Sequence, residues 1–282
     1  MGPHPFFSVI IPTFNRACFI EKAIRSVLIQ SSRDLELIVV DDGSDDGTEE
    51  LISAFKDERI VYRKQANQGV SSARNKGIAL SKGAFIAFLD SDDRWTEEKL
   101  KTTAAYIKKF PDIKIFHTEE VWYKNGRILP QKKKHKKPSG FIYADAVRLC
   151  CIGASTVVIK RDVFESIGTF DEDMEACEDY DLWLRATNKY EVKLIPEALT
   201  IKDGGRPDQL SSSVWGLDRL RIRALSKMLS AGLLDDEKYK ITYDEFEKKC
   251  KIFAAGCEKR EKKEEVAYYQ HLPERFIRKK KS

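Results

Sequence analysis

The chain of 282 residues has 50 lysines and arginines against 45 aspartates and glutamates, a formal net charge of +5, and 42% hydrophobic residues. This composition is that of an ordinary globular protein, and no apolar run approaches the roughly 18 residues of a membrane span, which argues against an integral membrane protein. The six cysteines form no CxxC pair and we expect no signal peptide, so the predicted location is the cytoplasm.

The first half of the chain alternates short apolar runs with helical patterns. This alternation predicts βαβ units and an α/β fold with a mixed, mostly parallel sheet flanked by helices. Apolar residues at helical spacing predict one helix around 20–28 and another at 97–109. The predicted strands are 7–11, 35–40, 60–63, 85–89 and 113–117.

The second half is less regular. Asn125-Gly126 predicts a hairpin turn, a strand is expected at 155–159, and a helix is expected after Glu178. We divide the chain into an α/β domain of residues 1–215, with halves of about 6–117 and 118–215, and a helical C-terminal extension of residues 216–282.

The C-terminal extension contains a capping-box pattern. Thr242 followed by Glu245 predicts a helix that begins at Thr242. Its apolar residues recur at helical spacing and define one buried face. These residues are Phe246, Cys250, Phe253, Ala254 and Cys257.

Basic residues gather in the run 132–137 and in the tail after Arg275. We interpret both as a solvated loop and tail. The alternative is a basic surface that contacts anionic lipid, which would place the protein peripherally at the inner face of the membrane. Nucleic acid is not expected as a partner because no aromatic residues interleave either run. No sequence feature specifies an oligomeric state.

Two predicted buried strands end in acids. Asp90, Asp92 and Asp93 follow the strand at 85–89, and Asp41 and Asp42 end the strand at 35–40. Open α/β sheets bind ligands at the carboxyl ends of their strands, and carboxylate oxygens suit Mg²⁺ or Mn²⁺. The chain has no Walker A and no GxGxxG motif, so no glycine-rich loop is expected to bind phosphate groups. A cation held by carboxylates would have to bind them instead.

The remaining acids have competing interpretations. Asp45 and Asp46 are interpreted as caps of the next helix. Glu178 and Asp179 open a predicted helix, where acids often serve only as partners of the helix dipole. A carboxylate that faces the metal site could instead accept a proton from a hydroxyl group, which is the task of a general base.

These elements, in this order, resemble the family 2 glycosyltransferases with the GT-A fold over about residues 6–205. The motifs that carry the resemblance are residues 9–16, 39–44, 67–69 with 73–75, 90–92, and 178–185. The resemblance implies an inverting, hexosyltransferase-type transfer from a nucleotide-diphosphate sugar, with UDP the preferred nucleotide. It also implies a divalent metal, Mg²⁺ or Mn²⁺, and a glycan or lipid-linked acceptor in cell-surface polysaccharide or lipid-linked glycan assembly. Residues 6–117 would be the nucleotide-sugar half and 118–215 the acceptor half.

The resemblance also implies residue roles. Asp92 would be the principal metal ligand with Asp90, Asp179 the catalytic base, and Glu178 a residue that positions the acceptor or the base. Many relatives carry a histidine after the last core strand, but residues 202–211 contain none. Arg206 is therefore a candidate to bind the diphosphate. The alternative is that Arg206 is an ordinary charged residue of a loop. The implied nucleotide-sugar-binding residues are Pro12, Thr13, Asn15, Asp41, Asp42, Arg74, Asp90 and Ser91.

Two other functions remain open at this point. A sugar-nucleotidyl transferase shares the architecture and the metal acids, but normally has a glycine-rich basic signature where this chain has Thr13-Phe14-Asn15-Arg16. A non-catalytic sugar-nucleotide-binding module would bind without turnover, and the intact acid at Asp179 argues against it.

Overall fold

The computed structural model describes residues 4–124, 126–130, 135–204 and 216–277. The chain forms two compact units. The first unit comprises Met1–Phe141, Cys151–Glu175 and Tyr190–Gly205, and the second comprises Ile142–Cys150, Ala176–Lys189 and Arg206–Ser282. The predicted domain boundary between residues 215 and 216 adjoins residues outside the described part of the chain, and it stays a prediction.

The first unit contains the sheet. Its elements are β1 (Phe7–Thr13), α1 (Ala17–Leu28), β2 (Leu35–Asp41), α2 (Thr48–Ser53), β3 (Ile60–Lys64), α3 (Val70–Leu80), β4 (Phe85–Phe88), β5 (Asp93–Trp95), α4 (Lys99–Lys109), β6 (Ile115–Lys124), β7 (Arg127–Leu129), the 3-10 turn η2 (Ala154–Thr156), β8 (Val157–Lys160), α6 (Asp162–Ile167) and β9 (Val192–Asp203). The predicted strands and both predicted helices of the first half are confirmed, and β6 pairs antiparallel with β7 as the expected hairpin.

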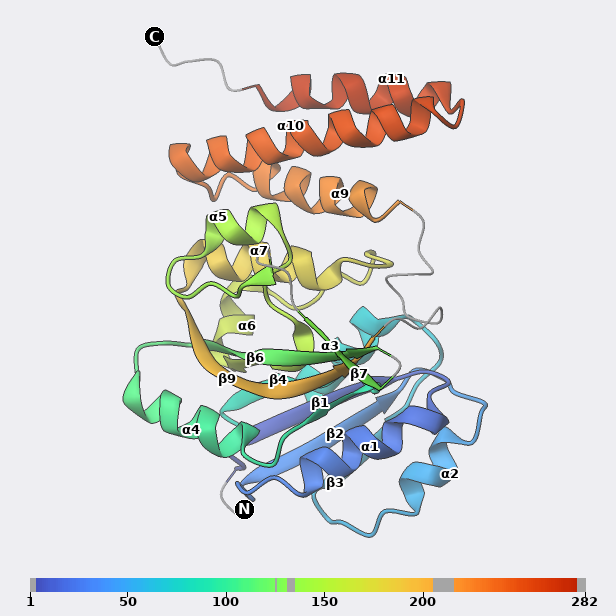
Figure 1. Cartoon of the computed structure of the whole chain (residues 1–282), viewed down its shortest axis with the longest axis vertical. Helices are drawn as coiled ribbons and strands as arrows, with labels where there is room; N and C mark the ends of the chain where they lie inside the picture. Colours follow the sequence, from blue (N-terminus) through green and yellow to red (C-terminus); the bar gives the residue numbers. More distant parts are fainter. Residues whose placement is uncertain (1–3, 125, 131–134, 205–215, 278–282) are drawn as a thin grey trace. The chain divides into compact units, whose positions relative to one another are not determined.

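The strands form one mixed sheet in the order β3-β2-β1-β4-β8-β6-β9-β5, with β7 attached to β6. Strands β3, β2, β1 and β4 are mutually parallel, which confirms the predicted βαβ units. Strand β8 is antiparallel to both of its neighbours. Strand β9 runs parallel to β6 (Figure 1). It runs antiparallel to the short β5. Strand β5 was not predicted from the sequence, and no bounds were predicted for β9.

Successive side chains of the central strands point to opposite faces of the sheet, and both faces are apolar. Odd-numbered residues of β1, β2 and β4, such as Val9, Leu37 and Ala87, pack with α1, α2 and α4 in one buried cluster. On the opposite face Phe88 meets the ring of Phe164 from α6 edge-to-face. Figure 1 shows α1 and α4 on one side of the sheet and α3 on the other. Burial on both faces explains why these strands read as continuous apolar runs.

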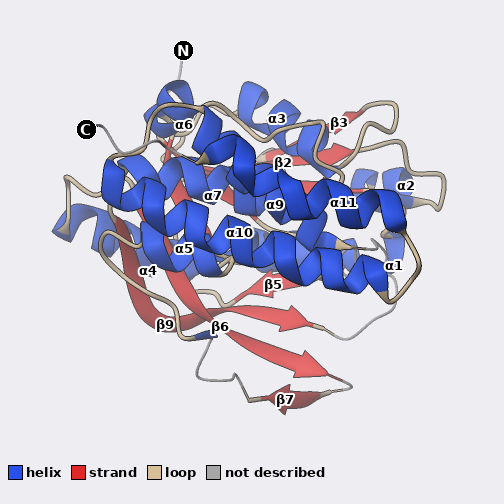
Figure 2. Ribbon diagram, turned by 90° about the horizontal axis from the view of Figure 1, so that it is seen from above, coloured by secondary structure: helices blue, strands red, loops and turns tan. Residues whose placement is uncertain are grey.

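The second unit is helical. Its elements are α5 (Tyr143–Arg148), α7 (Glu178–Lys189), α9 (Leu217–Ser230), α10 (Asp236–Glu258), α11 (Lys263–His271) and the 3-10 turn η3 (Leu272–Phe276). Figure 2 shows α10 lying alongside α9 and α11. The predicted helix after Glu178 is confirmed as α7. Among the described helices, none is long and apolar enough to cross a membrane.

The predicted start of the long helix was wrong. Helix α10 begins at Asp236, because the side chain of Asp235 accepts a hydrogen bond from the Lys238 amide and caps the helix. Thr242 lies inside the helix, where its hydroxyl donates to the Lys238 carbonyl at 2.7 Å. The predicted apolar face is confirmed. Its buried members are Phe246, Cys250, Ala254 and Cys257.

Close packing of α3 on β1 depends on Gly77. A Cβ at this position would collide with Ile10 Cγ2 and lie 3.1 Å from Ile10 Cγ1. We expect Gly77→Ala to destabilise the protein by about 1 kcal/mol or more, because overpacking costs about 1–3 kcal/mol and outweighs the helix preference for alanine of about 0.5–1 kcal/mol. Urea unfolding measures the change in the free energy of unfolding.

Two variants test this explanation. Gly256→Ala in α10 meets only Arg260 Nη1 at 3.4 Å, so it should be neutral or stabilising. Ile10→Ala should reduce the cost of Gly77→Ala in the double variant, because it removes the atoms that collide. Additive costs in the double variant would contradict the proposed collision.

Candidate active site

The carboxyl ends of β1 and β2 lie side by side. Thr13 is paired with Asp41, and the Asp42 amide donates to the Thr13 carbonyl at 2.8 Å. The Thr13 side chain is 4% exposed, and its hydroxyl has no hydrogen-bond partner among the described residues. Buried hydroxyl groups nearly always have a partner, so this one is an exception within the described residues.

The turn after β1 is tied to the turn after β2. The Asn15 amide donates to Ser44 Oγ at 2.9 Å, and Asn15 Oδ1 accepts from the Asp45 amide at 3.0 Å. Asn15 has φ 51°, a left-handed conformation that asparagine tolerates better than most residues. Pro12 is buried at the end of β1. The predicted nucleotide-binding residues of both turns are therefore gathered at one edge of the sheet.

The two strand-end acids have different contacts. Asp41 is fully buried, with Oδ1 accepting from the Ser44 amide and Oδ2 from the Tyr62 hydroxyl, each at 2.8 Å. Asp42 instead binds the loop before α3, accepting from the amides of Gln68 at 3.0 Å and Gly69 at 2.7 Å. Both acids brace loops at the carboxyl ends of the strands, and their contact with a nucleoside stays a prediction.

The neighbouring Asp46 behaves as a capping residue. Its Oδ1 accepts from the Thr48 amide at 3.2 Å, where α2 begins, and its Oδ2 accepts from the Ala17 amide at 2.9 Å, where α1 begins. Burial opposes ionisation, but these hydrogen bonds and one from the Thr48 hydroxyl lower the pKa of Asp46. The interpretation of Asp46 as a cap is supported.

The acidic turn, residues 90–93, follows β4 on the same edge. Asp90 Oδ1 accepts from Arg74 Nη2 at 2.8 Å, and the Arg74 side chain is 5% exposed beneath this contact. Burial disfavours the charged form of Asp90, but Arg74 and Lys202 outweigh it and lower the pKa of the carboxyl group. Ser91 is buried. The structure thus brings the predicted residues Arg74 and Asp90 into direct contact.

Asp93 closes the turn and points into the protein. Its Oδ2 accepts from Ser155 Oγ at 2.6 Å and lies 3.4 Å from Lys202 Nζ. Burial raises the pKa of Asp93 to about 7, although Lys202 opposes the shift. Asp93 is also the first residue of β5. Because its carboxylate contacts Ser155 and Lys202, Asp93 braces the turn and differs in role from Asp90 and Asp92.

The acids of the turn suit a divalent cation that also binds the phosphates of a ligand. In the part of the chain that the structure describes, no three histidine, cysteine, aspartate or glutamate side chains form a group able to hold a metal by themselves. Mg²⁺ is typically held by one or two carboxylates together with substrate phosphates. Asp92 and Asp90 match that oxygen donor set, so a metal site here would be completed by the phosphates of a ligand.

The other predicted acids belong to the second unit. Asp179 lies in the first turn of α7, where Oδ1 accepts from the Tyr180 amide at 2.7 Å and Oδ2 from the Cys150 thiol at 3.3 Å. Glu178 is buried. Asp181 pairs with Arg185 and Lys227. The two carboxylates of this helix therefore have different partners, cations for Asp181 and an amide and a thiol for Asp179.

The structure also reveals functional candidates that the sequence did not. Lys202 lies beside the acidic turn only because β9 pairs with β5, and no local pattern announces this pairing. Lys137 was interpreted as part of a solvated loop, and this was wrong: it is 6% exposed and lies 3.2 Å from Glu120. His135 and Lys136 are exposed as expected. Arg206, Lys132–Lys134 and the tail after residue 277 lie outside the described residues.

Comparison with known proteins identifies the family of the chain. The model of the family described as "Glycosyl transferase family 2" matches residues 8–168, more than half of the chain. TuaG of Bacillus subtilis, which its name assigns to teichuronic acid biosynthesis as a glycosyltransferase, is 36% identical over 161 residues, 56% of this chain and 63% of TuaG. The Escherichia coli UDP-Glc:alpha-D-GlcNAc-diphosphoundecaprenol beta-1,3-glucosyltransferase WfaP is 31% identical over 64% of this chain and 70% of its own length.

The fold has a solved counterpart. The crystal structure of Staphylococcus aureus TarS residues 1–349 in complex with UDP-GlcNAc aligns with a TM-score of 0.72 at 22% identity, covering 86% of this chain and 71% of that chain. This likeness confirms the predicted GT-A fold. The chain spans less than two thirds of TuaG, and 32% of a longer uncharacterized glycosyltransferase of Rickettsia felis. On the family match and this fold, the chain belongs to glycosyl transferase family 2.

Proposed function

We propose that the protein transfers a sugar from a nucleotide-diphosphate sugar to an acceptor hydroxyl group, with inversion at the anomeric carbon and with a divalent metal. The observation that carries this proposal is the gathering of Asp90, Asp92 and Arg74 at the sheet edge where β1 and β2 also end. Family membership supports the reaction class.

The donor nucleotide would lie across the ends of β1 and β2. The unpartnered hydroxyl of Thr13 offers a hydrogen bond there, and Asp42 holds the adjoining loop through Gly69. UDP is the proposed nucleotide, because the name of WfaP and the TarS complex both refer to UDP-sugars. Bound at Asp92 and Asp90, Mg²⁺ or Mn²⁺ would neutralise charge on the diphosphate.

Asp179 is the proposed general base. Its carboxylate would take the proton of the acceptor hydroxyl, whose oxygen forms the new bond to the anomeric carbon. The bond from that carbon to the diphosphate breaks, and the nucleoside diphosphate leaves with the electron pair. Attack on the side opposite the leaving group inverts the anomeric configuration. Glu178 would position the acceptor or the base.

The acceptor would be a glycan or a lipid-linked sugar of cell-surface polysaccharide synthesis. The names of TuaG and WfaP support this class, since one refers to teichuronic acid and the other to a diphosphoundecaprenol-linked sugar. A lipid-linked acceptor would bring the protein to the cytoplasmic face of a membrane. The exposed His135 and Lys136 agree with a basic surface at the end of the run 132–137.

Nucleotide binding tests the donor class. In a thermal-shift panel of UDP, GDP, dTDP and CMP, with and without Mn²⁺, we expect UDP with Mn²⁺ to give the largest rise in Tm. Ligand at about 100 times its Kd stabilises the native state by about 2.7 kcal/mol, which raises Tm by about 5–10 °C in a domain of this size. Mn²⁺ alone should shift Tm little, because in the described part of the chain no three histidine, cysteine, aspartate or glutamate side chains form a group that could hold a metal.

The same panel can reject the proposal. Absence of any shift with all four nucleotides would contradict a sugar-nucleotide enzyme. Release of pyrophosphate from a nucleoside triphosphate would favour the alternative of a sugar-nucleotidyl transferase. Binding without transfer to any lipid-linked or glycan acceptor would favour a non-catalytic binding module.

Substitutions separate the base from the metal site. We expect Asp179→Asn to bind UDP with Mn²⁺ as the wild type does and to lose about 10²–10⁴-fold in kcat, the usual contribution of a general base. Asp92→Ala should weaken Mn²⁺-dependent UDP binding by at least about tenfold, because it removes a carboxylate from the metal site. Calorimetric titration measures binding, and product release from UDP-sugar measures turnover.

Asp145→Asn is the matched control, because Asp145 is an exposed acid in the first turn of α5. It should leave both binding and turnover unchanged. Full turnover in Asp179→Asn would remove that residue as the base while leaving the donor class intact.

A further inference from the structure

Lys202 is held on β9 between two neighbouring strands. It is paired with Asp93 of β5 and with Trp122 of β6, and residues paired across strands project from the same face of a sheet. Its Nζ lies 3.4 Å from Asp93 Oδ2 and 5.5 Å from the centroid of the Trp122 ring. The side chain is 17% exposed. Lys202 is therefore a largely buried cation in a defined position.

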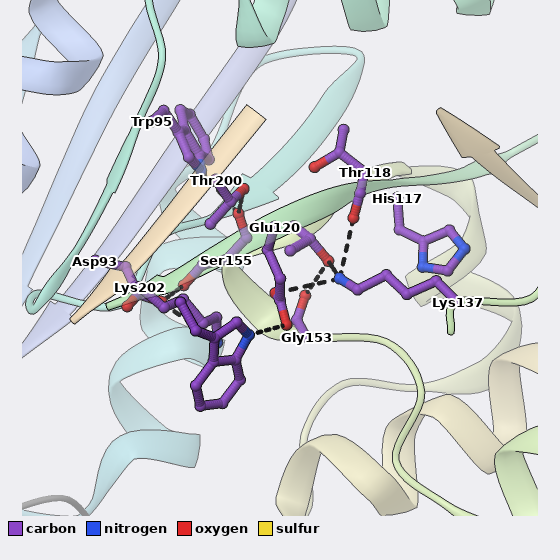
Figure 3. Close-up of polar contacts among 12 residues, drawn as sticks. Asp93, Trp95, His117, Thr118, Glu120, Lys137, Gly153, Ser155, Thr200 and Lys202 are labelled. Carbon is purple, nitrogen blue, oxygen red and sulfur yellow. Dashed lines mark hydrogen bonds and ion pairs between the residues drawn. The ribbon is translucent and has the colours of Figure 1, made fainter. Parts of the chain in front are cut away.

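Lys202 belongs to a row of alternating charges in the order Lys137, Glu120, Lys202 and Asp93. Glu120 Oε2 lies 3.2 Å from Lys137 Nζ. A Cβ on Gly153 would lie 3.2 Å from Glu120 Oε2 and 3.6 Å from Lys202 Nζ, so the Gly153 backbone lies against both charges. Figure 3 shows these side chains gathered into one cluster. Each buried charge in the row has a neighbour of opposite sign.

The row ends at the acidic turn. Ser155 Oγ donates to Asp93 Oδ2 at 2.6 Å and accepts from the Asp90 amide at 3.1 Å, which joins the last residue of the turn to the first. Arg74 pairs with Asp90 on the other side. Nearby carboxylates repel one another, and a fixed cation offsets that repulsion. Lys202 is thus placed to set the shape of the turn through Asp93.

We propose that Lys202 is a positioning residue for the donor site. Lys202 lies between the acidic turn and Glu120 and binds Asp93. Through Asp93 it holds Asp90 and Asp92 where a nucleotide diphosphate and its divalent cation can bind. This role rests on the proposed function and adds a residue to it. Lys202 acts through Asp93 and need not touch the ligand.

Calorimetric titration of Lys202→Met with UDP and Mn²⁺ tests the role. We expect about a 10–100-fold loss of Mn²⁺-dependent UDP affinity, the range typical when the support of a metal ligand is removed. UDP binding without metal should change little. Lys202→Arg should recover part of the loss, because the positive charge is retained.

A double variant separates positioning from direct contact. Asp93→Asn keeps an oxygen that can accept from Ser155 and removes the charge that Lys202 offsets, so Asp93→Asn/Lys202→Met should bind UDP with Mn²⁺ more tightly than Lys202→Met. Equal affinities of the single and double variants, together with weaker UDP binding by Lys202→Met in the absence of metal, would show that Lys202 acts on the ligand itself, which would overturn the positioning role. If Lys202→Met does not fold, Glu120→Gln removes the neighbouring carboxylate and should weaken binding in the same direction.

Lys114→Met is the matched control, since Lys114 pairs with Asp162 through a partly exposed contact outside the acidic turn. It should bind as the wild type does. Wild-type affinity in both Lys202→Met and Glu120→Gln, while the wild type binds UDP with Mn²⁺, would overturn this inference alone. Absence of binding by the wild type to UDP, GDP and dTDP would instead contradict the proposed function.

Discussion

Electrostatic repulsion among the carboxylates that follow β4 is the constraint around which this edge of the sheet in the first unit is built. Three acids within residues 90–93 cannot lie at the end of a buried strand unless cations and donors offset their charge. Arg74 from α3, Lys202 from β9 and Ser155 from η2 supply that compensation. Because these residues come from three distant segments, the acidic turn also ties the parallel and antiparallel parts of the sheet together.

Compensation of carboxylate charge by neighbouring groups also distinguishes the acids of α7. Asp181 is buried and held by two cations, so its carboxylate is committed to structure. Asp179 accepts from a backbone amide and a thiol, both neutral groups. Two acids separated by one residue on one helix therefore have different partners, and the difference comes from their surroundings.

Sequence patterns were sufficient to predict those elements whose structure depends on residues close together in the chain. Burial on both faces makes β1, β2 and β4 continuous apolar runs, and the helical repeat of α1 matches its packing against them. Helix α10 shows where local rules compete. Thr242 and Glu245 match a capping box, yet Asp235 caps the helix first, and Thr242 then bonds back to Lys238 inside it.

The sequence by itself determined the parallel strands, the acids at their ends and the family motifs, because each depends on residues close together in the chain. Only the tertiary structure decided which charges meet. The pairing of Asp93 with Lys202 and the burial of Lys137 beside Glu120 depend on the register of β9, β6 and β5. That register is set by packing between distant segments, and a slip of one residue would turn Lys202 to the opposite face.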